Sequence, residues 1–228
     1  MNILAFDTSS SDIISVALQI DEKVACYEVD SPSGHSQMLM YMADKLMEGF
    51  QVKPECLNLV ACAKGPGSFT GLRIGYSLAK GLALALGIPL AAVPTLDYIA
   101  HPLSAAQGIV IPVLDAKKSC FFSCLYRGGK RLSDYADATC RQIADEIEKH
   151  QTHKDEQVVL SGSGAGLLYP RLLEFFNEGN IIIDQNAKRG RGKELIEIAK
   201  RTILERGSLD SGPLYLRKSD AELSAKGE

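Results

Sequence analysis

A pattern of apolar runs repeats once along the 228-residue chain and constrains its fold more than any other feature. The run over residues 3–6 ends at Asp7, and the run over residues 109–114 ends at Asp115, 108 residues later. After each Asp come two further strand patterns joined by a short turn, and then helix, strand and helix patterns. The sequence therefore predicts an α/β protein of two duplicated β-β-β-α-β-α lobes.

The predicted elements divide the chain into two lobes and a tail. The first lobe spans residues 1–103, the second spans 104–217, residues 94–107 join them, and residues 218–228 form a polar tail. Strands are predicted over residues 3–6, 13–20, 23–29, 57–63, 89–93, 109–114, 120–126, 130–135, 158–160 and 181–184. Helices are predicted over residues 36–50, 70–86, 141–150, 167–177 and 193–205.

The composition is that of a globular protein with a full apolar core, since 46% of the residues are hydrophobic and 23% are charged. The chain has 25 Lys and Arg residues against 28 Asp and Glu residues, and this net charge of −3 excludes a general nucleic-acid-binding protein. The six cysteines form no CxxC pair. We therefore expect buried thiols in a reducing compartment rather than a zinc or disulfide framework.

The sequence carries no pattern typical of a secretory signal or a membrane span. The first twelve residues lack a basic region and already contain Asp7. Residues 74–93 are largely apolar, but Lys80 and the Gly-Ile-Pro at 87–89 interrupt them, so we expect a buried helix followed by a strand. These patterns predict a cytoplasmic protein with no membrane partner.

A glycine-rich segment lies between a predicted strand and a predicted helix. Backbone N–H groups at a helix start can bind an anion. Alternatively, Ser68 or Thr70 caps the helix while the glycines allow a tight turn and close packing. The segment lacks the Lys of a GxxxxGK[ST] loop, so it is not a Walker A motif. The residues concerned are Gly65, Pro66, Gly67, Ser68, Thr70 and Gly71.

The helix predicted over 70–86 has small residues on two sides. Gly71, Gly75 and Ala79 form one stripe of small side chains, and Ser77, Gly81 and Ala85 form another. One side packs on the sheet of the same lobe, and the other is covered by a neighbouring helix or by another subunit. We expect the stripe that contains Gly75 to allow close approach of a partner helix.

The helix predicted over 36–50 has apolar residues outside its core stripe. Met38, Met40 and Tyr41 share a side with charged residues such as Lys45, whereas Met42 belongs to the core stripe. Exposed Met and Tyr side chains indicate either an adaptable contact surface or a wider core.

Three other groups of residues have an ordinary structural interpretation. His35 caps or orders a loop, since no orienting carboxylate or nucleophile can be assigned nearby. His150 and His153 lie in a polar stretch and are expected in solvent. The basic run at 188–193 is either a solvated helix start or a phosphate contact to RNA.

Five short motifs carry a family resemblance. The duplicated lobe with an Asp-ended first strand resembles the actin/sugar kinase/Hsp70 superfamily. The segment GPGSFTGLRIG at residues 65–75 resembles the signature of the TsaB (YeaZ) family, which takes part in making threonylcarbamoyladenosine in bacterial tRNA. Four further segments are similar to that family's pattern, namely residues 3–9, 34–36, 115–117 and 213–217.

The resemblance implies a degenerate nucleotide cleft. Superfamily kinases place a glycine two residues after the second Asp, but Asp115 is followed by Ala116 and Lys117. Residues 93–101 also lack the HxxxH metal pair of the catalytic sister family, TsaD. We therefore expect no catalytic residues, no metal and no firmly bound cofactor, with nucleotide held only weakly or at a partner interface. The residues of this degenerate cleft are Asp7, Thr8, Ser9, Asp115, Gly162 and Gly164.

The resemblance also implies partners. A TsaB-like chain is a scaffold that pairs with TsaD, and with the ATPase TsaE, for threonylcarbamoyl transfer to the adenosine next to the anticodon of tRNAs decoding ANN codons. It forms a homodimer when alone and meets tRNA only through the complex. The predicted interface residues are Met38, Tyr41, Met42, Lys45, Arg73, Gly75, Tyr76 and Lys80. The alternative is an autonomous actin-like ATPase or phosphotransferase.

Overall fold

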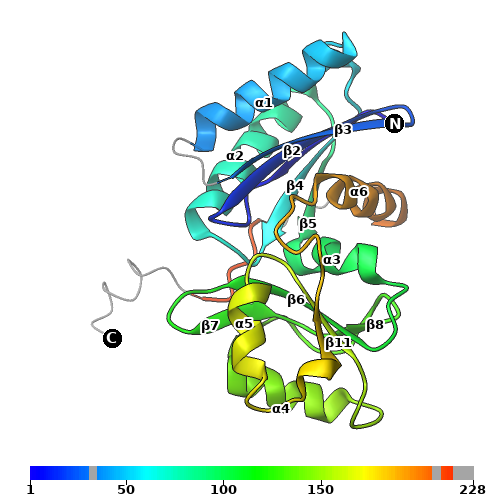
Figure 1. The fold of residues 1–228 in the computed structure, drawn as a ribbon. Coiled ribbons are helices and arrows are strands. Elements are labelled where there is room, and N and C mark those ends of the chain that lie inside the picture. Colours follow the sequence, from blue (N-terminus) through cyan, green and yellow to red (C-terminus); the bar gives the residue numbers. More distant parts are fainter. Residues whose placement is uncertain (31–34, 207–211, 218–228) are drawn as a thin grey trace.

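The computed structural model describes residues 1–30, 35–206 and 212–217, without the side chains of residues 35–37 and 206 (Figure 1). The first half forms β1 (Ile3–Asp7), β2 (Ile13–Ile20), β3 (Lys23–Asp30), α1 (His35–Phe50), β4 (Leu59–Gly65), α2 (Phe69–Leu86), β5 (Leu90–Pro94) and α3 (Thr95–Ala100). The second half forms β6 (Ile109–Asp115), β7 (Cys120–Ser123), β8 (Tyr126–Arg127), β9 (Lys130–Arg131), β10 (Ala136–Thr139), α4 (Cys140–His150), β11 (Val158–Ser161), α5 (Ala165–Leu172), β12 (Ile181–Ile183) and α6 (Gly192–Arg206).

The two sheets have the same strand order. In the first sheet the order is β3-β2-β1-β4-β5, with β1, β4 and β5 parallel and β2 and β3 antiparallel to their neighbours. The main path of the second sheet, β10-β7-β6-β11-β12, repeats this arrangement, and β8 and β9 lie off it. Asp7 and Asp115 therefore end equivalent strands, β1 and β6. The predicted duplication is confirmed.

Helices and sheets alternate in layers (Figure 1). Helices α1 and α2 cover one face of the first sheet, over a core that includes Phe6 and Leu39. The other face meets α3 and α6, whose apolar side chains join residues of both sheets, such as Ile3 and Val110, in one central cluster. Helices α4 and α5 cover the far face of the second sheet. The lobes thus share a continuous apolar core.

The last helix does not follow the predicted division at residues 104–217. Helix α6 packs on β1, β2, β4 and β5 of the first sheet. The segment leading into it fits closely, because a Cβ added at Gly192 would lie 2.7 Å from the Ala17 Cβ. An amphipathic pattern shows that a helix needs an apolar surface, but it does not show which sheet supplies that surface.

Several boundaries also differ from the prediction. The strand expected over 120–126 is divided at Cys124 and Leu125, so that β7 and β8 pair with different parts of β6. The third strand of this lobe lies at β10 rather than over 130–135. Helix α5 ends earlier than expected, and the predicted joint contains the short helix α3, whose side chains are largely buried.

Two predictions lie outside the described part of the chain. They concern the polar tail over 218–228 and the side chain of His35. Among the helices that the structure describes, none is both long and apolar enough to cross a membrane.

Candidate functional site

A cavity of about 520 Å³ lies between the lobes. The turn after β1, the start of α2, the turn after β6 and the segment before the C-terminal tail all line it. It thus joins motifs that are far apart in the sequence. The described lining residues are Ser9, Ser10, Ser11, Pro66, Gly67, Ser68, Phe69, Thr70, Arg73, Leu114, Asp115, Ala116, Lys117, Lys118, Phe122, Ser163, Leu214, Tyr215, Leu216 and Arg217.

The first turn holds the Asp7 carboxylate behind the cavity. Its Oδ1 accepts hydrogen bonds from the Ser9 N–H at 3.0 Å and from the Ser9 hydroxyl at 2.7 Å. The Ser9 and Tyr98 hydroxyl oxygens are 3.0 Å apart. Burial raises the pKa of Asp7, and the hydrogen bonds from Ser9 and Tyr98 offset only part of this effect. Asp7 therefore acts as a buried anchor for the turn.

The glycine motif packs tightly against this first turn. A Cβ at Gly67 would overlap the Ser9 carbonyl oxygen, and a Cβ at Gly71 would overlap that of Thr8. The Ser68 N–H donates to the Ser9 carbonyl at 2.7 Å, and the Ser68 hydroxyl accepts from the Gly71 N–H at 3.3 Å, which caps α2. The capping and close-packing interpretation is confirmed. Anion binding by this loop stays a prediction, and these two N–H groups already have acceptors.

The second turn places Lys117 on the Asp115 carboxylate. The Lys117 N–H donates to Oδ1 and its ammonium donates to Oδ2, each at 2.8 Å. Burial alone would raise the pKa of Asp115, but the hydrogen bonds and charge of Lys117, with the charge of Arg171, outweigh it and lower the pKa. The backbone φ is +61° at Lys117, +53° at Lys118 and +61° at Ser119, a region that glycine favours.

The glycine turn after β11 supports the second turn from behind. The Gly164 N–H donates to the Val113 carbonyl at 3.0 Å, and a Cβ at Gly164 would lie 2.9 Å from the Asp115 nitrogen. Gly162 has φ of +98°, and a Cβ there would overlap the Val113 carbonyl oxygen. Both glycines pack on the end of β6, and their neighbour Ser163 is the residue of this turn that lines the cavity.

The segment over 212–217 connects the two lobes along one side of the cavity. The Leu214 N–H donates to the Lys64 carbonyl of the first lobe at 2.7 Å. Arg217 donates to both carboxylate oxygens of Asp137, at 2.6 and 2.8 Å, and to the Ala116 carbonyl at 2.8 Å. Two-point Arg–carboxylate pairing fixes direction as well as distance. This segment therefore positions the second turn relative to α2.

An aromatic and cationic group forms the cavity wall beside α2. The rings of Phe69 and Tyr215 are 4.9 Å apart, and the Arg73 guanidinium lies 3.9 Å from the Phe69 ring centre. The Arg73 Nε–H also donates to the Tyr215 hydroxyl at 3.3 Å. Arg73, predicted as an interface residue, thus lines the cavity while its side chain remains exposed.

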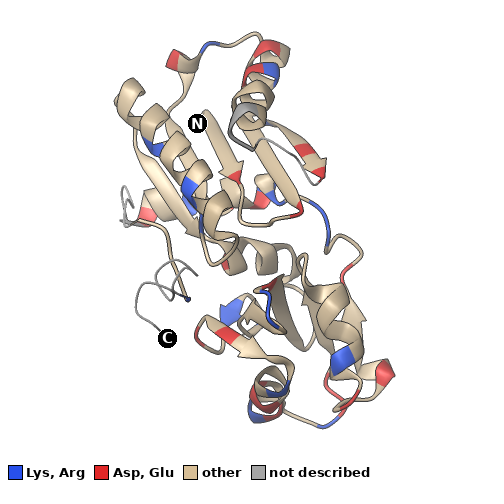
Figure 2. Cartoon of the chain, turned by 90° about the vertical axis from the view of Figure 1, so that its left-hand side faces the viewer, with Lys and Arg blue, Asp and Glu red and all other residues tan. Residues whose placement is uncertain are grey.

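The predicted interface residues divide into an exposed group and a buried group. Tyr41, Lys45, Arg73 and Lys80 are exposed, and Met38 is half-buried. Helix α2 carries basic residues and no acidic ones (Figure 2). A role of these five residues in an interface stays a prediction.

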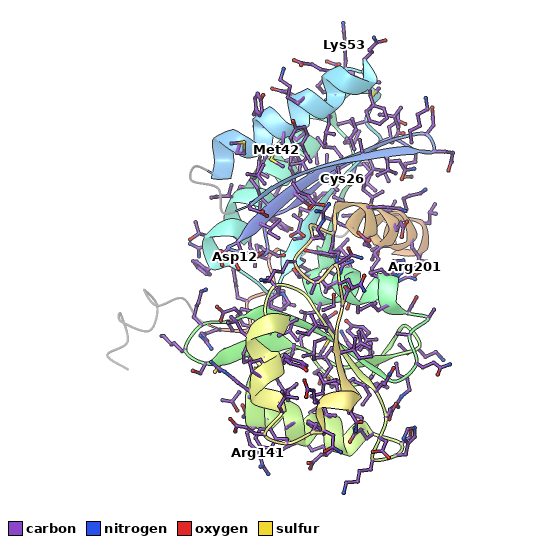
Figure 3. The ribbon with its side chains drawn as sticks, in the orientation of Figure 1. Asp12, Cys26, Met42, Lys53, Arg141 and Arg201 are labelled. Atoms are coloured by element: carbon purple, nitrogen blue, oxygen red, sulfur yellow. The ribbon has the colours of Figure 1, made fainter. Side chains whose placement is uncertain are left out.

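Three predicted interface residues lie inside the fold instead, which corrects that part of the prediction. Met42 is fully buried on the side of α1 that faces the sheet (Figure 3). Gly75 packs against the Thr8 side chain, and the buried Tyr76 accepts a hydrogen bond at 2.9 Å from the Gly212 N–H. The Gly75 stripe therefore faces β1 of the same chain.

The exposed surface of α1 and α2 contains one large residue that sequence reasoning missed, Leu84, which is 73% exposed on α2. Met40, expected outside the core stripe of α1, is 40% exposed. The second small-residue stripe of Ser77, Gly81 and Ala85 is also exposed. Its spacing was visible in the sequence, but its orientation was not, because both sides of α2 carry small residues. We call this surface, with Tyr41, the α1/α2 face.

Known proteins resemble this chain along nearly its whole length. A family model described as TsaD, tRNA N6-adenosine threonylcarbamoyltransferase, matches residues 30–222. A Bacillus subtilis protein named tRNA threonylcarbamoyladenosine biosynthesis protein TsaB is 30% identical over 226 residues, which cover 97% of this chain and 96% of that protein. The chain belongs to the TsaB family.

Two further proteins resemble this TsaB-family chain, one in its fold and one over part of its sequence. The solved structure of YeaZ from Pseudomonas aeruginosa has a TM-score of 0.77 at 23% identity and covers 94% of this chain and 99% of that chain. The predicted α/β fold of two duplicated lobes is thereby confirmed. A tRNA N6-adenosine threonylcarbamoyltransferase of Nitratidesulfovibrio vulgaris is 37% identical over 95 residues, covering 41% of this chain and 26% of that protein.

The carboxylates at the ends of β1 and β6 accept hydrogen bonds from within this TsaB-family chain. Both oxygens of Asp115 accept from Lys117, while Asp7 accepts from Ser9 and does not line the cavity. Magnesium binding requires carboxylate oxygens that are open to the ion or its waters. Within the described part of the chain, no group of three His, Cys, Asp or Glu side chains could hold a metal ion.

The basic run over 188–193 contains a buried ion pair. Arg191 is 6% exposed, and its Nη2 donates to the Asp184 carboxylate at 2.5 Å and to the Ser161 hydroxyl at 3.0 Å. Arg189 lies 3.6 Å from Glu28 of β3. Arg191 is therefore structural, which corrects the prediction for this residue, whereas Lys188, Arg189 and Lys193 are exposed and a phosphate contact by them stays a prediction. His150 pairs with Glu146 of its own helix at 3.2 Å.

Proposed function

We propose that this chain is a non-catalytic subunit that pairs with TsaD and, in the complex, with the ATPase TsaE. The complex would transfer a threonylcarbamoyl group to the adenosine next to the anticodon of tRNAs decoding ANN codons. Relatives covering nearly the whole chain carry the name of this biosynthesis. One observation supports the non-catalytic role. Lys117 donates hydrogen bonds to both oxygens of Asp115, so the second turn has no carboxylate oxygen without a donor.

The α1/α2 face supports the pairing part of the proposal. It presents Tyr41 and Leu84, two large side chains that are 53% and 73% exposed. Aromatic and apolar side chains at the centre of an interface supply most of its affinity once partner atoms exclude water from them. In the absence of TsaD, a second copy of this chain covers the same face.

The alternative is an autonomous ATPase or phosphotransferase. The cavity is large enough for a nucleotide, since ligand pockets span about 300–1,000 Å³. However, such an enzyme needs groups that hold a metal and activate a nucleophile, and the carboxylates of both turns are engaged within the chain. We propose that nucleotide is held only weakly, in this cavity or at the partner interface.

The test is a reconstituted tRNA reaction. Purified TsaD, TsaE, threonylcarbamoyl-adenylate and a tRNA that decodes ANN codons are combined with or without this chain, and modified adenosine is measured by mass spectrometry. We expect product only when TsaD and this chain are both present. Product from this chain without TsaD, or steady ATP turnover by this chain alone, would support the alternative instead.

A further inference from the structure

The Lys117 side chain has an unusual position in the interlobe cavity. Its ammonium lies 2.8 Å from Asp115 Oδ2, yet the side chain remains 67% exposed. An ammonium has three N–H donors, and one carboxylate contact leaves donors for a ligand. Lys117 lines the cavity, so those donors are available to an anion bound there.

The charges around the cavity favour an anion. Among its described lining residues, Arg73, Lys117, Lys118 and Arg217 are cations and Asp115 is the one carboxylate. Neighbouring carboxylates reduce the positive charge around the cavity. Arg217 is paired with Asp137. The pKa of Lys117 is raised, first by the hydrogen bond to Asp115 and less by the charge of Asp12. The hydroxyl groups of Ser10, Ser68 and Thr70 also line the same space and add neutral donors.

The turn geometry is also specific. Three successive residues adopt positive φ, which costs energy for side chains other than glycine. This conformation carries the Lys117 N–H and ammonium to the two oxygens of one carboxylate. A divalent cation bound to Asp115 would need the position that the ammonium already holds.

From this geometry we propose that Lys117 replaces a divalent metal ion in the cavity, so that a phosphate-bearing ligand of nucleotide size binds there without metal. The proposal deepens the weak nucleotide binding proposed above and does not depend on pairing with TsaD. The ammonium neutralises Asp115 and donates to a phosphate oxygen. Arg73 and the Phe69–Tyr215 ring pair form the wall that a planar ring contacts.

The experiment is an NMR titration of the full-length ¹⁵N-labelled chain with ADP and, separately, with pyrophosphate. Both are added first in EDTA and then with excess Mg²⁺. We expect shifts at the amides of Ser68 and Lys117 in EDTA, with dissociation constants in the millimolar range that Mg²⁺ does not improve. A tenfold or greater gain in affinity on adding Mg²⁺, or no shifts in EDTA, would overturn the proposal.

Two variants test the lysine itself. Lys117→Met keeps the length of the side chain without its charge, and Lys117→Gly suits the positive φ and so protects folding. Both should lose about tenfold or more in affinity for pyrophosphate, equivalent to about 1.4 kcal/mol. Lys130→Met on the exposed β9 hairpin is the matched control and should bind as wild type does.

Wild-type affinity in both Lys117 variants, with the dispersed spectra of folded protein, would contradict the role given to this residue. Pairing with TsaD is read separately by size-exclusion chromatography. A failure to pair would contradict the proposed function and leave the cavity result unchanged.

Discussion

Gly75 of α2 packs directly against Thr8 at the end of β1, so that a Cβ added at Gly75 would overlap Thr8 Oγ1. The same hydroxyl donates a hydrogen bond to the Gly71 carbonyl at 2.7 Å. Thr8 thus occupies the space that two glycines, one turn apart, leave open, with its side chain at Gly75 and its carbonyl oxygen at Gly71. The small-residue stripe allows α2 to approach the first turn of its own lobe.

The first prediction concerns this contact. Gly75→Ala should destabilise the isolated chain by about 1–3 kcal/mol, because Thr8 or α2 must move to admit the methyl group. Gly81→Ala is the matched control, since a Cβ added at Gly81 of the same helix would have no neighbouring atom within 4 Å. The control should gain about 0.5–1 kcal/mol from the better helix propensity of Ala. Urea denaturation measures both, and equal free energies of unfolding would contradict the assignment.

The second prediction concerns the α1/α2 face. Leu84→Asp should abolish detectable pairing with TsaD, since a charge at the centre of an apolar contact must be desolvated without a partner. Leu204→Asp is matched, because Leu204 is 77% exposed on α6 and Leu84 is 73% exposed on α2. The Leu204 variant should pair as wild type does. Sedimentation velocity at micromolar concentration measures the pairing of each variant with TsaD. Equal pairing by the two variants would exclude the α1/α2 face as the interface with TsaD.

The third prediction concerns the buried pair of Arg191 and Asp184. Asp184→Asn should cost about 3 kcal/mol of unfolding free energy, because it leaves the buried Arg191 guanidinium with only Glu194, 4.0 Å away, as a compensating charge. Burial by itself would raise the pKa of Asp184, but hydrogen bonds from Asn186, Ser161 and Arg191 lower it below its ordinary value of 3.8.

That lowered pKa sets the pH dependence. The unfolded chain takes up the proton of Asp184 first as the pH falls, so the pair's stabilisation is complete above about pH 4 and decreases below it. Urea titrations at several pH values should show the difference between wild type and Asp184→Asn shrink below about pH 4. A difference that stays constant down to pH 3 would contradict the assignment.

The fourth prediction concerns the segment that links the lobes. Arg217→Lys should lose about 1.5–3 kcal/mol, because a lysine cannot reproduce the two-point contact with Asp137 and the bond to Ala116. Arg141→Lys is the control, since Arg141 and Asp145 form an exposed pair at 3.0 Å that contributes about 0.5 kcal/mol or less. Thermal unfolding compares them, and similar losses would show that the Arg217 contacts carry no special weight.

The succession of strands and helices in each lobe was predictable from the sequence, because the duplication appears in local patterns of apolar residues. Each apolar run ends at an Asp, and the parallel and antiparallel partners follow from the short turns and the helical crossovers. The capping of α2 by Ser68 was also predictable, since Ser at that position has a well-defined local role.

The direction in which α2 presents its two small-residue stripes was not predictable. The stripes that contain Gly75 and Gly81 are made of similar small residues. Only the position of Thr8 in the fold distinguishes the buried stripe from the exposed one. The cavity likewise depends on contacts across the chain, such as that of Leu214 with Lys64. The pairing of Lys117 with Asp115 was missed because it requires positive φ at a residue that rarely adopts it.

The return of α6 to the first sheet has a consequence for the order of events during synthesis. The first lobe's strands and its α1 and α2 leave the ribosome early, but residues 192–206 cover the other face of that sheet. At about 5–20 residues per second, the nascent first lobe waits for several seconds with only α3 to cover part of that face. The order of the chain thus leaves this apolar surface exposed to solvent until α6 has been made.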